Sequence, residues 1–325
     1  MSRSIWLLLL GALCCHPAPA EAADDCDRAC LRRILDQYLT AVTTHTPAAA
    51  PLFSAFRQTE NAVVVRLGTG MWKTATGLGK LQRRYLDPVS GEAGYFGVID
   101  EGTGSAIVTV RLRVERRQIS EAEWFIARRG DPGLNGPQQP GQPAGNFFDP
   151  DNLAANPPPE RVVPKGERSS REAMIAITNS YFDGITTHDG SIIMAHGGCA
   201  RTENGTTVTG RAAGARGATT PSPAPSRSGG PAVTDCTSGL ETINIQMVAA
   251  RRYPIVDEDA GVVLALAVFI RRPGTTTRRN AFSEWFVIEN GKIRSIYSAM
   301  FYPSPEVPVP NWPPYDGNWP IRTAP

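Results

Sequence analysis

The sequence predicts an α+β protein made of two related domains in tandem. Each half starts with an amphipathic helix and continues with segments of strand periodicity, an order typical of antiparallel sheets covered by helices. Two short sequence motifs recur with the same shift of 143 residues: positions 38–45 resemble 181–188, and positions 59–61 resemble 202–204. A chain of 325 residues, with 41% hydrophobic and 20% charged side chains, is long enough to form two cores.

The N-terminus has the features of a secretory signal peptide over residues 1–23. Arg3 supplies a positive charge, residues 5–15 form an apolar run, and small residues at 18–20 or 20–22 provide a cleavage pattern. The apolar run is shorter than the ~20 residues that a membrane-spanning helix needs. We therefore expect an exported protein, periplasmic or extracellular, with no membrane span.

Four cysteines follow the leader, and export would place them in an oxidising compartment. Four cysteines allow three pairings, of which local closure favours Cys26 with Cys30 and Cys199 with Cys236. The alternative, a reactive cysteine, needs a nearby basic partner that no local pattern supplies.

Periodicity places the elements of each half in order. Apolar spacing predicts helices over residues 24–41 and 174–185. In the first half, strands are predicted over residues 62–67, 93–99, 106–115 and 119–127. In the second half, they are predicted over residues 243–255, 261–271, 281–289 and 292–302. The final hairpins correspond, so the second half is expected to hold one extra hairpin. Residues 261–270 are apolar on both faces, which predicts packing between the halves or a homodimer through sheet faces.

Composition shifts divide the chain further. The first domain is expected over residues 24–130 and the second over residues 165–303. A Pro- and Gly-rich linker is predicted at 131–164, a low-complexity insertion at 206–233, and a Pro- and Trp-rich tail at 304–325.

Charge and residue counts exclude several classes of function. A formal net charge of +2, without a run of five basic residues, argues against a nucleic-acid partner. Four histidines and six cysteines, with no Cys-x-x-Cys spacing, argue against a zinc site built by the protein.

The order of elements resembles the cone fold of SnoaL-like and nuclear transport factor 2-like proteins. The first half, with Thr59-Glu60-Asn61, the segment 68–74 and the segment 119–123, is similar to secreted bacterial and fungal proteins classed as a domain of unknown function. The resemblance implies that, in each of two tandem cone-like domains, N-terminal helices pack on a curved antiparallel sheet and leave a cavity for a small hydrophobic molecule. It also implies acid/base chemistry without a metal or an organic cofactor.

Two histidines end the first helix of each half at equivalent positions. His45 and His188 are candidate general acids or bases, because the charge of histidine changes near neutral pH. The alternative is a histidine that stabilises a helix C-terminus and faces the solvent.

Two glutamates occur at the centre of the repeated Thr-Glu-Asn motif. Glu60 and Glu203 are candidate acid/base groups if they are buried with a raised pKa, and parts of a side-chain-capped turn otherwise. Asn204 also begins a glycosylation sequon, which is consistent with a surface turn.

Two further candidates lie on the last strands. Alternation places Glu284 on one face with Phe282 and Phe286, where it is either a desolvated acid or the ion-pair partner of an arginine such as Arg271. Tyr297 either polarises a substrate carbonyl or completes the core.

Alternating charges in the first half have an explanation that needs no chemistry. Arg111 and Arg113 precede Glu121 and Glu123 on successive strands, which predicts cross-strand ion pairs on a solvated or inter-domain face.

The preferred function is a cofactor-independent lyase, dehydratase or isomerase that acts on a small hydrophobic cyclic or aromatic compound. Its acid/base groups are expected among His45, Glu60, His188, Glu203, Glu284 and Tyr297. The alternatives are a non-catalytic exported binding protein and a structural envelope protein whose cavity is filled by its own side chains.

Overall fold

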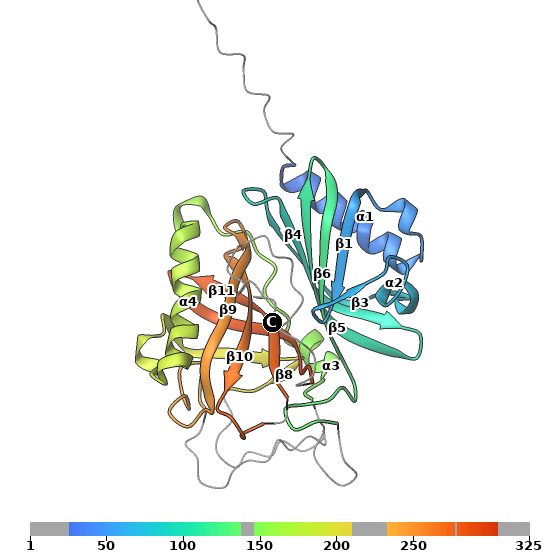
Figure 1. Cartoon of the computed structure of the whole chain (residues 1–325). Coiled ribbons are helices and arrows are strands. Elements are labelled where there is room, and N and C mark those ends of the chain that lie inside the picture. Colours follow the sequence, from blue (N-terminus) through green and yellow to red (C-terminus); the bar gives the residue numbers. More distant parts are fainter. Residues whose placement is uncertain (1–25, 138–145, 210–232, 277, 305–325) are drawn as a thin grey trace, which may run out of the picture.

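The computed structural model describes residues 26–137, 146–209, 233–276 and 278–304 (Figure 1). The predicted signal peptide, most of the predicted insertion at 206–233 and the tail beyond residue 304 lie outside the described residues.

The first half forms a six-stranded sheet with one long helix, α1 (Arg28–Thr43). Its strands are β1 (Leu52–Glu60), β2 (Val63–Val65), β3 (Gly77–Asp87), β4 (Glu92–Glu101), β5 (Gly104–Glu115) and β6 (Gln118–Arg128). A short helix, α2 (Met71–Thr74), lies between β2 and β3 in the sequence. The strand order is β2-β1-β6-β5-β4-β3, and β1 runs parallel to β6 while the other neighbours are antiparallel.

The second half repeats this plan. Its long helix is α4 (Arg171–Thr187). Its strands are β7 (Ala195–Glu203), β8 (Thr206–Thr207), β9 (Ile245–Asp257), β10 (Val262–Arg271), β11 (Asn280–Glu289) and β12 (Lys292–Phe301). The order is β8-β7-β12-β11-β10-β9, again with one parallel pair, β7 with β12. The prediction of an α+β chain built from two related units is therefore confirmed.

Four strands, β1, β3, β7 and the two-residue β8, were not predicted from the sequence. In β3 and β7, glycines interrupt the alternation, and β3 also carries Lys80, Arg83 and Arg84. In β1, three exposed residues in a row conceal the period of two. The expected extra hairpin in the second half is wrong, because β3 pairs with β4 in the same way that β9 pairs with β10.

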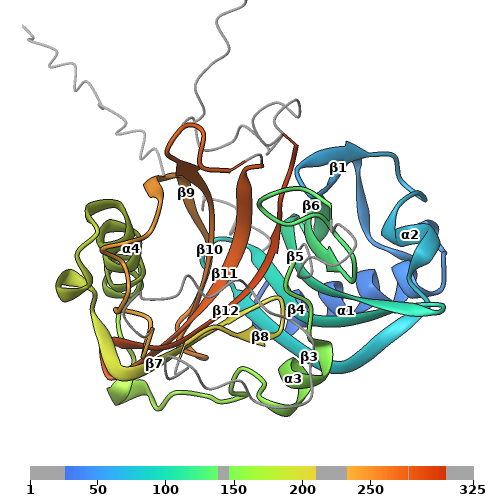
Figure 2. The ribbon, with the colours of Figure 1, turned by 90° about the horizontal axis from the view of Figure 1, so that it is seen from below.

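The two sheets face each other, and each carries its long helix on the outer side. Figure 1 shows the order α4, second sheet, first sheet and α1, and Figure 2 shows the same layers from below. A separate hydrophobic cluster lies between each helix and its own sheet, and a third cluster lies between the sheets. On β10, Leu264 and Leu266 enter the cluster between the sheets while Val263 and Phe269 enter the cluster under α4. The predicted burial of this strand on both sides is confirmed, and the other half of the same chain covers the face that we considered for a homodimer.

A buried ionic network lies on the inter-domain side of the first sheet. The Arg111 side chain is 1% exposed and donates to Glu92 at 2.5 Å and to Glu121 at 2.8 Å. From the other half, Arg252 donates to Glu123 at 2.6 Å. The predicted cross-strand ion pairing on an inter-domain face is thus confirmed.

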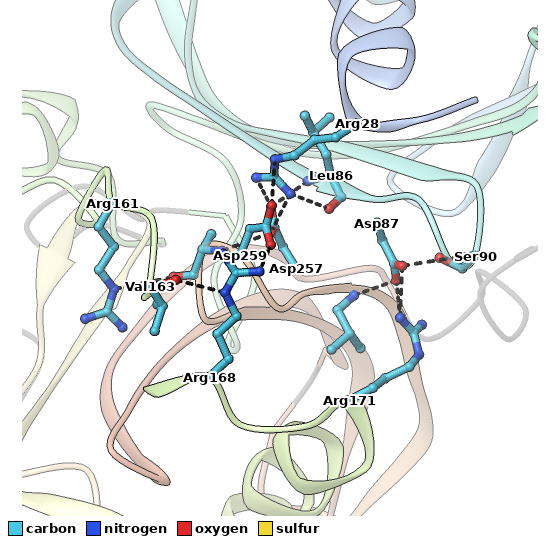
Figure 3. Close-up of polar contacts among 12 residues, drawn as sticks. Arg28, Leu86, Asp87, Ser90, Arg161, Val163, Arg168, Arg171, Asp257 and Asp259 are labelled. Carbon is cyan, nitrogen blue, oxygen red and sulfur yellow. Dashed lines mark hydrogen bonds and ion pairs between the residues drawn. The ribbon is translucent and has the colours of Figure 1, made fainter. Parts of the chain in front are cut away.

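A reciprocal pair of contacts, which we call the arginine–aspartate clamps, joins the halves (Figure 3). Arg28, the first residue of α1, donates to both carboxylate oxygens of Asp257 at 2.7 and 2.8 Å. Arg171, the first residue of α4, donates to Asp87 at 2.7 and 2.9 Å. Asp257 also accepts from the backbone N–H of Leu86, and Asp87 from that of Val256. Each half therefore holds the first turn of the other half's helix through a buried carboxylate.

The described part of the predicted linker is packed against both sheets. Its helix, α3 (Pro150–Ala155), lies near β3 and β8 in Figure 2 and places the fully buried Leu153 in the inter-domain cluster. Asn152 donates to the backbone oxygen of Gly205 at 2.6 Å. This segment is therefore part of the folded core as well as a connection.

Both predicted disulfides are present. Cys26 is bonded to Cys30 at the first turn of α1, and Cys199 of β7 is bonded to Cys236. Two disulfides fit a protein of an oxidising compartment. Among the described residues, no helix has the length and apolar character needed to cross a membrane.

The asparagine of each Thr-Glu-Asn motif lies in a turn and forms hydrogen bonds with the neighbouring strand. Asn61 and Asn204 have positive φ angles of 48° and 44°. The Asn204 side chain accepts from the N–H of Met300 at 2.8 Å and donates to its C=O at 3.1 Å, and Asn61 makes the same pair of bonds with Ile126. Asn204 is completely buried. The expectation of an exposed sequon is therefore wrong, since this amide is occupied by the strand that it supports.

Replacing Asn204 by alanine is expected to lower the free energy of unfolding by about 2 kcal/mol, because both backbone groups of Met300 lose a buried partner. Urea denaturation of the full chain measures this loss. The exposed Asn156 supplies the control, since its side chain bonds only within its own turn and Asn156→Ala should cost about 0.5 kcal/mol or less. Equal stability of the two variants would contradict the assigned role.

Candidate functional site

The two sheets carry equivalent rows of side chains, and the rows differ in size and polarity. In the first domain, strand register aligns Glu60, Trp124, Val110 and Tyr95. In the second domain, it aligns Glu203, Ser298, Glu284 and Ala265. The second domain therefore has two small residues where the first has two large aromatic ones, and a carboxyl group where the first has a valine.

The space between the long helix and the sheet of each domain is called its interior below. In the first domain, hydrogen-bonded side chains fill this space. Tyr38 and the indole N–H of Trp72 both donate to Gln58 Oε1, at 2.9 and 2.7 Å. The indole N–H of Trp124 donates to the Tyr38 hydroxyl at 3.0 Å, and Gln58 donates to Glu60 at 3.0 Å. Among the described residues, none of these five side chains leaves a buried polar atom without a partner. Two indoles thus fill this interior.

Glu60 and His45 hold the short helix α2 in place. The Glu60 carboxylate accepts from the N–H of Met71 at 2.8 Å, and burial raises its pKa despite this bond. A Cβ atom at Gly70 would collide with the same carboxylate, which explains the glycine. His45 Nδ1 lies 2.7 Å from the backbone oxygen of Trp72. Both residues therefore have structural partners.

The second interior contains a polar cluster beside Ser298, which takes the position of Trp124. Tyr181 of α4 accepts a hydrogen bond from Arg201 Nη1 at 2.7 Å, and Arg201 Nε lies 3.1 Å from Glu203 Oε1. We call Tyr181, Arg201, Glu203, Glu284 and Ser298 the second-domain cluster. The Arg201 and Glu203 side chains are 19% and 17% exposed, so the cluster reaches the surface at this end.

Glu284 is the most unusual member of the cluster. Strand alternation directs it towards α4 between Phe282 and Phe286, as predicted, and it is 1% exposed. Burial raises its pKa to about 8; the positive charge of Arg201 lowers the pKa and the negative charge of Glu203 raises it. The carboxyl group is therefore protonated at neutral pH.

Several buried polar atoms of the second domain have no hydrogen-bond partner among the described residues. They include Glu284 Oε2, Asn280 Oδ1 and Arg271 Nε. Asn280 and Glu284 alternate with phenylalanines that pack under α4, and Arg271 lies over the ring of Phe269 on that side. Because buried polar groups in folded proteins nearly always have partners, these atoms indicate a place for a ligand or water.

The remaining predicted residues lie away from this cluster. His188 caps the C-terminus of α4 with a φ of 61°, and its Nε2 lies 2.7 Å from the backbone oxygen of Ile245. Tyr297 faces the first domain, where it lies against Phe96, and its hydroxyl donates to the backbone oxygen of Pro157 in the connecting segment at 3.3 Å. The structure thus brings Glu203 and Glu284 together, but not His45, Glu60, His188 or Tyr297.

Sequence reasoning missed Arg201 as a functional residue and assigned Tyr181 only to an apolar helix face. The segment before Arg201 contains Gly197 and Gly198 and suggests a turn, yet it belongs to β7. A usable signal was present, because Arg201 lies two residues before Glu203 and must share its face within a strand.

Two surface hollows lie outside the cluster. One of about 500 Å³ is lined by residues 241–244, Arg272, Gly274 and Thr275. The other, of about 150 Å³, lies between residues 161–169 and the hairpin ends near Gly261 and Glu289. Neither is lined by Glu203 or Glu284. Among the described residues, no group of three or more His, Cys, Asp or Glu side chains is placed to hold a metal ion.

A comparison with protein families finds a relationship in the second half. A domain of unknown function, DUF8021, matches residues 167–300. This segment includes α4, β7 and the whole second-domain cluster, but it is less than half of the chain. No curated protein and no solved structure matches the sequence. The family match therefore falls on the domain that contains Glu284 and Arg201, whereas the sequence resemblance to a domain of unknown function was found in the first half.

Proposed function

We propose that the protein is an exported, cofactor-independent lyase, dehydratase or isomerase whose site is the second-domain cluster. The observation that carries the proposal is Glu284, a protonated carboxyl group buried beside the salt bridge of Arg201 with Glu203. The substrate is a small hydrophobic cyclic or aromatic compound. Periplasmic or extracellular residence is part of the same proposal and is supported by the two disulfides.

Two carboxyl groups in different environments support an acid and a base in one site. Glu284, neutral because of its burial, donates a proton to a leaving hydroxyl or to a carbonyl oxygen of the substrate. Glu203, paired with Arg201, is the neighbouring base that takes a proton from carbon. The bond between Tyr181 and Arg201 fixes the guanidinium that orients Glu203.

The cone-like fold of SnoaL-like and nuclear transport factor 2-like proteins is part of the proposal. Its support is the repeated arrangement of one long helix over a six-stranded sheet, with a single parallel pair of strands in each half. In the first domain, Trp72 and Trp124 fill the corresponding interior, so we assign that domain a structural role.

Glu284→Gln tests the proposal, because it keeps the shape of the side chain and removes the proton that is donated. Purified protein is incubated with a pooled panel of aromatic dimers, polyketide-like phenols, terpenoids and steroids, and loss of water or of an aldehyde is followed by mass spectrometry. We expect turnover to fall about a hundredfold or more in Glu284→Gln. The wild-type rate should fall as pH rises through about 8, because Glu284 then loses its proton. Glu60→Gln in the first domain is the matched control and should leave turnover unchanged.

The alternative of a non-catalytic binding protein is supported by the same unpartnered atoms, Asn280 Oδ1 and Arg271 Nε, which need only hold a ligand. Retention of an unchanged compound by both the wild type and Glu284→Gln would favour binding over catalysis. A Glu284→Gln variant with full turnover would overturn the assignment of the acid.

A further inference from the structure

The end of the second domain's interior, near the last residues of β10 and β12, differs in charge from the equivalent end in the first domain. Counting along the strands from the aligned row places Arg271 where the first domain has Glu101, and Tyr302, directly after β12, where it has Arg128. In the first domain, these positions form an ion pair, since Arg128 donates to Glu101 at 2.6 and 2.9 Å. The corresponding positions of the second domain form no such pair. A carboxylate at position 302 would be needed to pair with Arg271, and the residue there is a tyrosine.

Among the described residues, Arg271 has no acidic side chain in ion-pair contact. Its Nη1 group contacts the amide oxygen of Asn244, its Nε has no hydrogen-bond partner, and burial lowers its pKa. The carboxylate that acts on it electrostatically is Glu203, which is already paired with Arg201. A half-buried guanidinium with spare donors is suited to an anionic group.

The surroundings of Arg271 restrict the kind of anion. The Arg271 guanidinium lies 5.9 Å from the ring centre of Phe269, whose ring centre lies 4.4 Å from that of Phe282. Asn280 is 3% exposed and leaves its side-chain carbonyl without a partner in the described structure. This end of the interior therefore offers a cation, an apolar aromatic wall and a hydrogen-bond acceptor.

We propose that the substrate of the second-domain site is a small hydroxylated aromatic carboxylic acid, bound by its carboxylate to Arg271 with its ring against Phe269 and Phe282. Its hydroxyl group donates to Asn280. This inference rests on the proposed function, since it assigns the substrate class of the same site. Glu203 links the two ends of the site, because it acts electrostatically on both Arg271 and Glu284.

Calorimetric titration of the full chain with 2-hydroxybenzoate, benzoate and benzamide tests the inference. Benzamide matches benzoate in shape but lacks the charge. We expect both acids to bind at least about tenfold more tightly than benzamide, and Arg271→Gln to remove about tenfold or more of that affinity. Arg271→Lys, which keeps the charge but loses the planar fork, should retain part of the affinity and guards against a folding defect.

The neighbouring Arg272 supplies the matched control. Arg272 lines the surface hollow formed with residues 241–244, outside the proposed site, so Arg272→Gln should leave the affinity for benzoate unchanged. Loss of binding in Arg272→Gln but not in Arg271→Gln would place the anion in that hollow and overturn the inference, as would equal affinity for benzoate and benzamide. Glu284→Gln should still bind benzoate. Binding that depends on Arg271 without turnover of any compound would refute the proposed enzyme alone, and turnover of neutral compounds unaffected by Arg271→Gln would refute the substrate class alone.

Discussion

Asp257→Ala is expected to lower the free energy of unfolding by about 3–5 kcal/mol. The Asp257 side chain is completely buried and accepts from the Arg28 guanidinium, from the N–H of Leu86 at 2.8 Å and from the N–H of Ala260 at 3.0 Å. Alanine would leave these donors without their acceptor at the boundary of the two halves. Most of the loss comes from the N–H groups of Leu86 and Ala260, which stay buried without an acceptor, since the Arg28 side chain is 35% exposed and water can solvate its charge.

Urea denaturation with Arg28→Ala, Asp257→Ala and the double variant measures the clamp. The double variant should lose less than the sum of the single losses, because the two residues share one interaction. Asp87→Ala should reproduce the effect of Asp257→Ala in the other clamp. Glu115→Ala is the control, since its pair with Arg113 is exposed and should contribute less than about 1 kcal/mol. A loss below about 1 kcal/mol in Asp257→Ala would show that the halves associate without the clamps.

Glu284→Gln should stabilise the protein at alkaline pH. The pKa of Glu284 is raised from 4.5 to about 8 in the folded protein, so between these values the folded state keeps a proton that the unfolded state releases. The contribution of Glu284 to stability therefore falls as pH rises through this window and is lowest above about 8. Glutamine does not titrate and escapes this loss, which is of the order of 5 kcal/mol.

The measurement compares the free energies of unfolding of the wild type and Glu284→Gln at pH 5, 7 and 9. The difference in favour of glutamine should increase with pH and reach a plateau above about 8. The exposed Glu115→Gln variant should give a curve parallel to that of the wild type. A pH-independent difference for Glu284→Gln would show that the carboxyl group is ionised and stabilised in the fold, and the acid role would fall with it.

Much of the fold could be predicted because the main strands bury alternate residues. The segments that became β4, β5, β6 and β9–β12 have apolar runs or clear alternation, and α1 and α4 have helical spacing. Pairing in space could not be predicted so directly. The parallel contacts of β1 with β6 and of β7 with β12 join distant segments, and the weak periodicity of β1 and β7 left them unassigned.

The candidate site shows the same division. Glu284 stood out in the sequence because a carboxyl group on an apolar strand face is unusual, and its environment agrees with that expectation. Glu203 was predicted through its repeat partner Glu60. Only the strand register shows that Glu203 lies beside Ser298 whereas Glu60 lies beside Trp124. The histidines misled for a physical reason: a residue that closes a helix in the left-handed conformation can use its ring to bond a backbone carbonyl, as His188 does.

The reciprocity of the two clamps has a consequence for how the chain can diverge. In an isologous dimer, every contact occurs twice because the same patch serves both partners, and the clamps follow this rule within one polypeptide. Gene fusion makes the association unimolecular and frees each copy from the sequence of the other. A substitution then alters one pocket and not both. One copy can thus carry tryptophan at position 124 and act as a scaffold, while the other carries the small Ser298 at the equivalent position beside a carboxyl group.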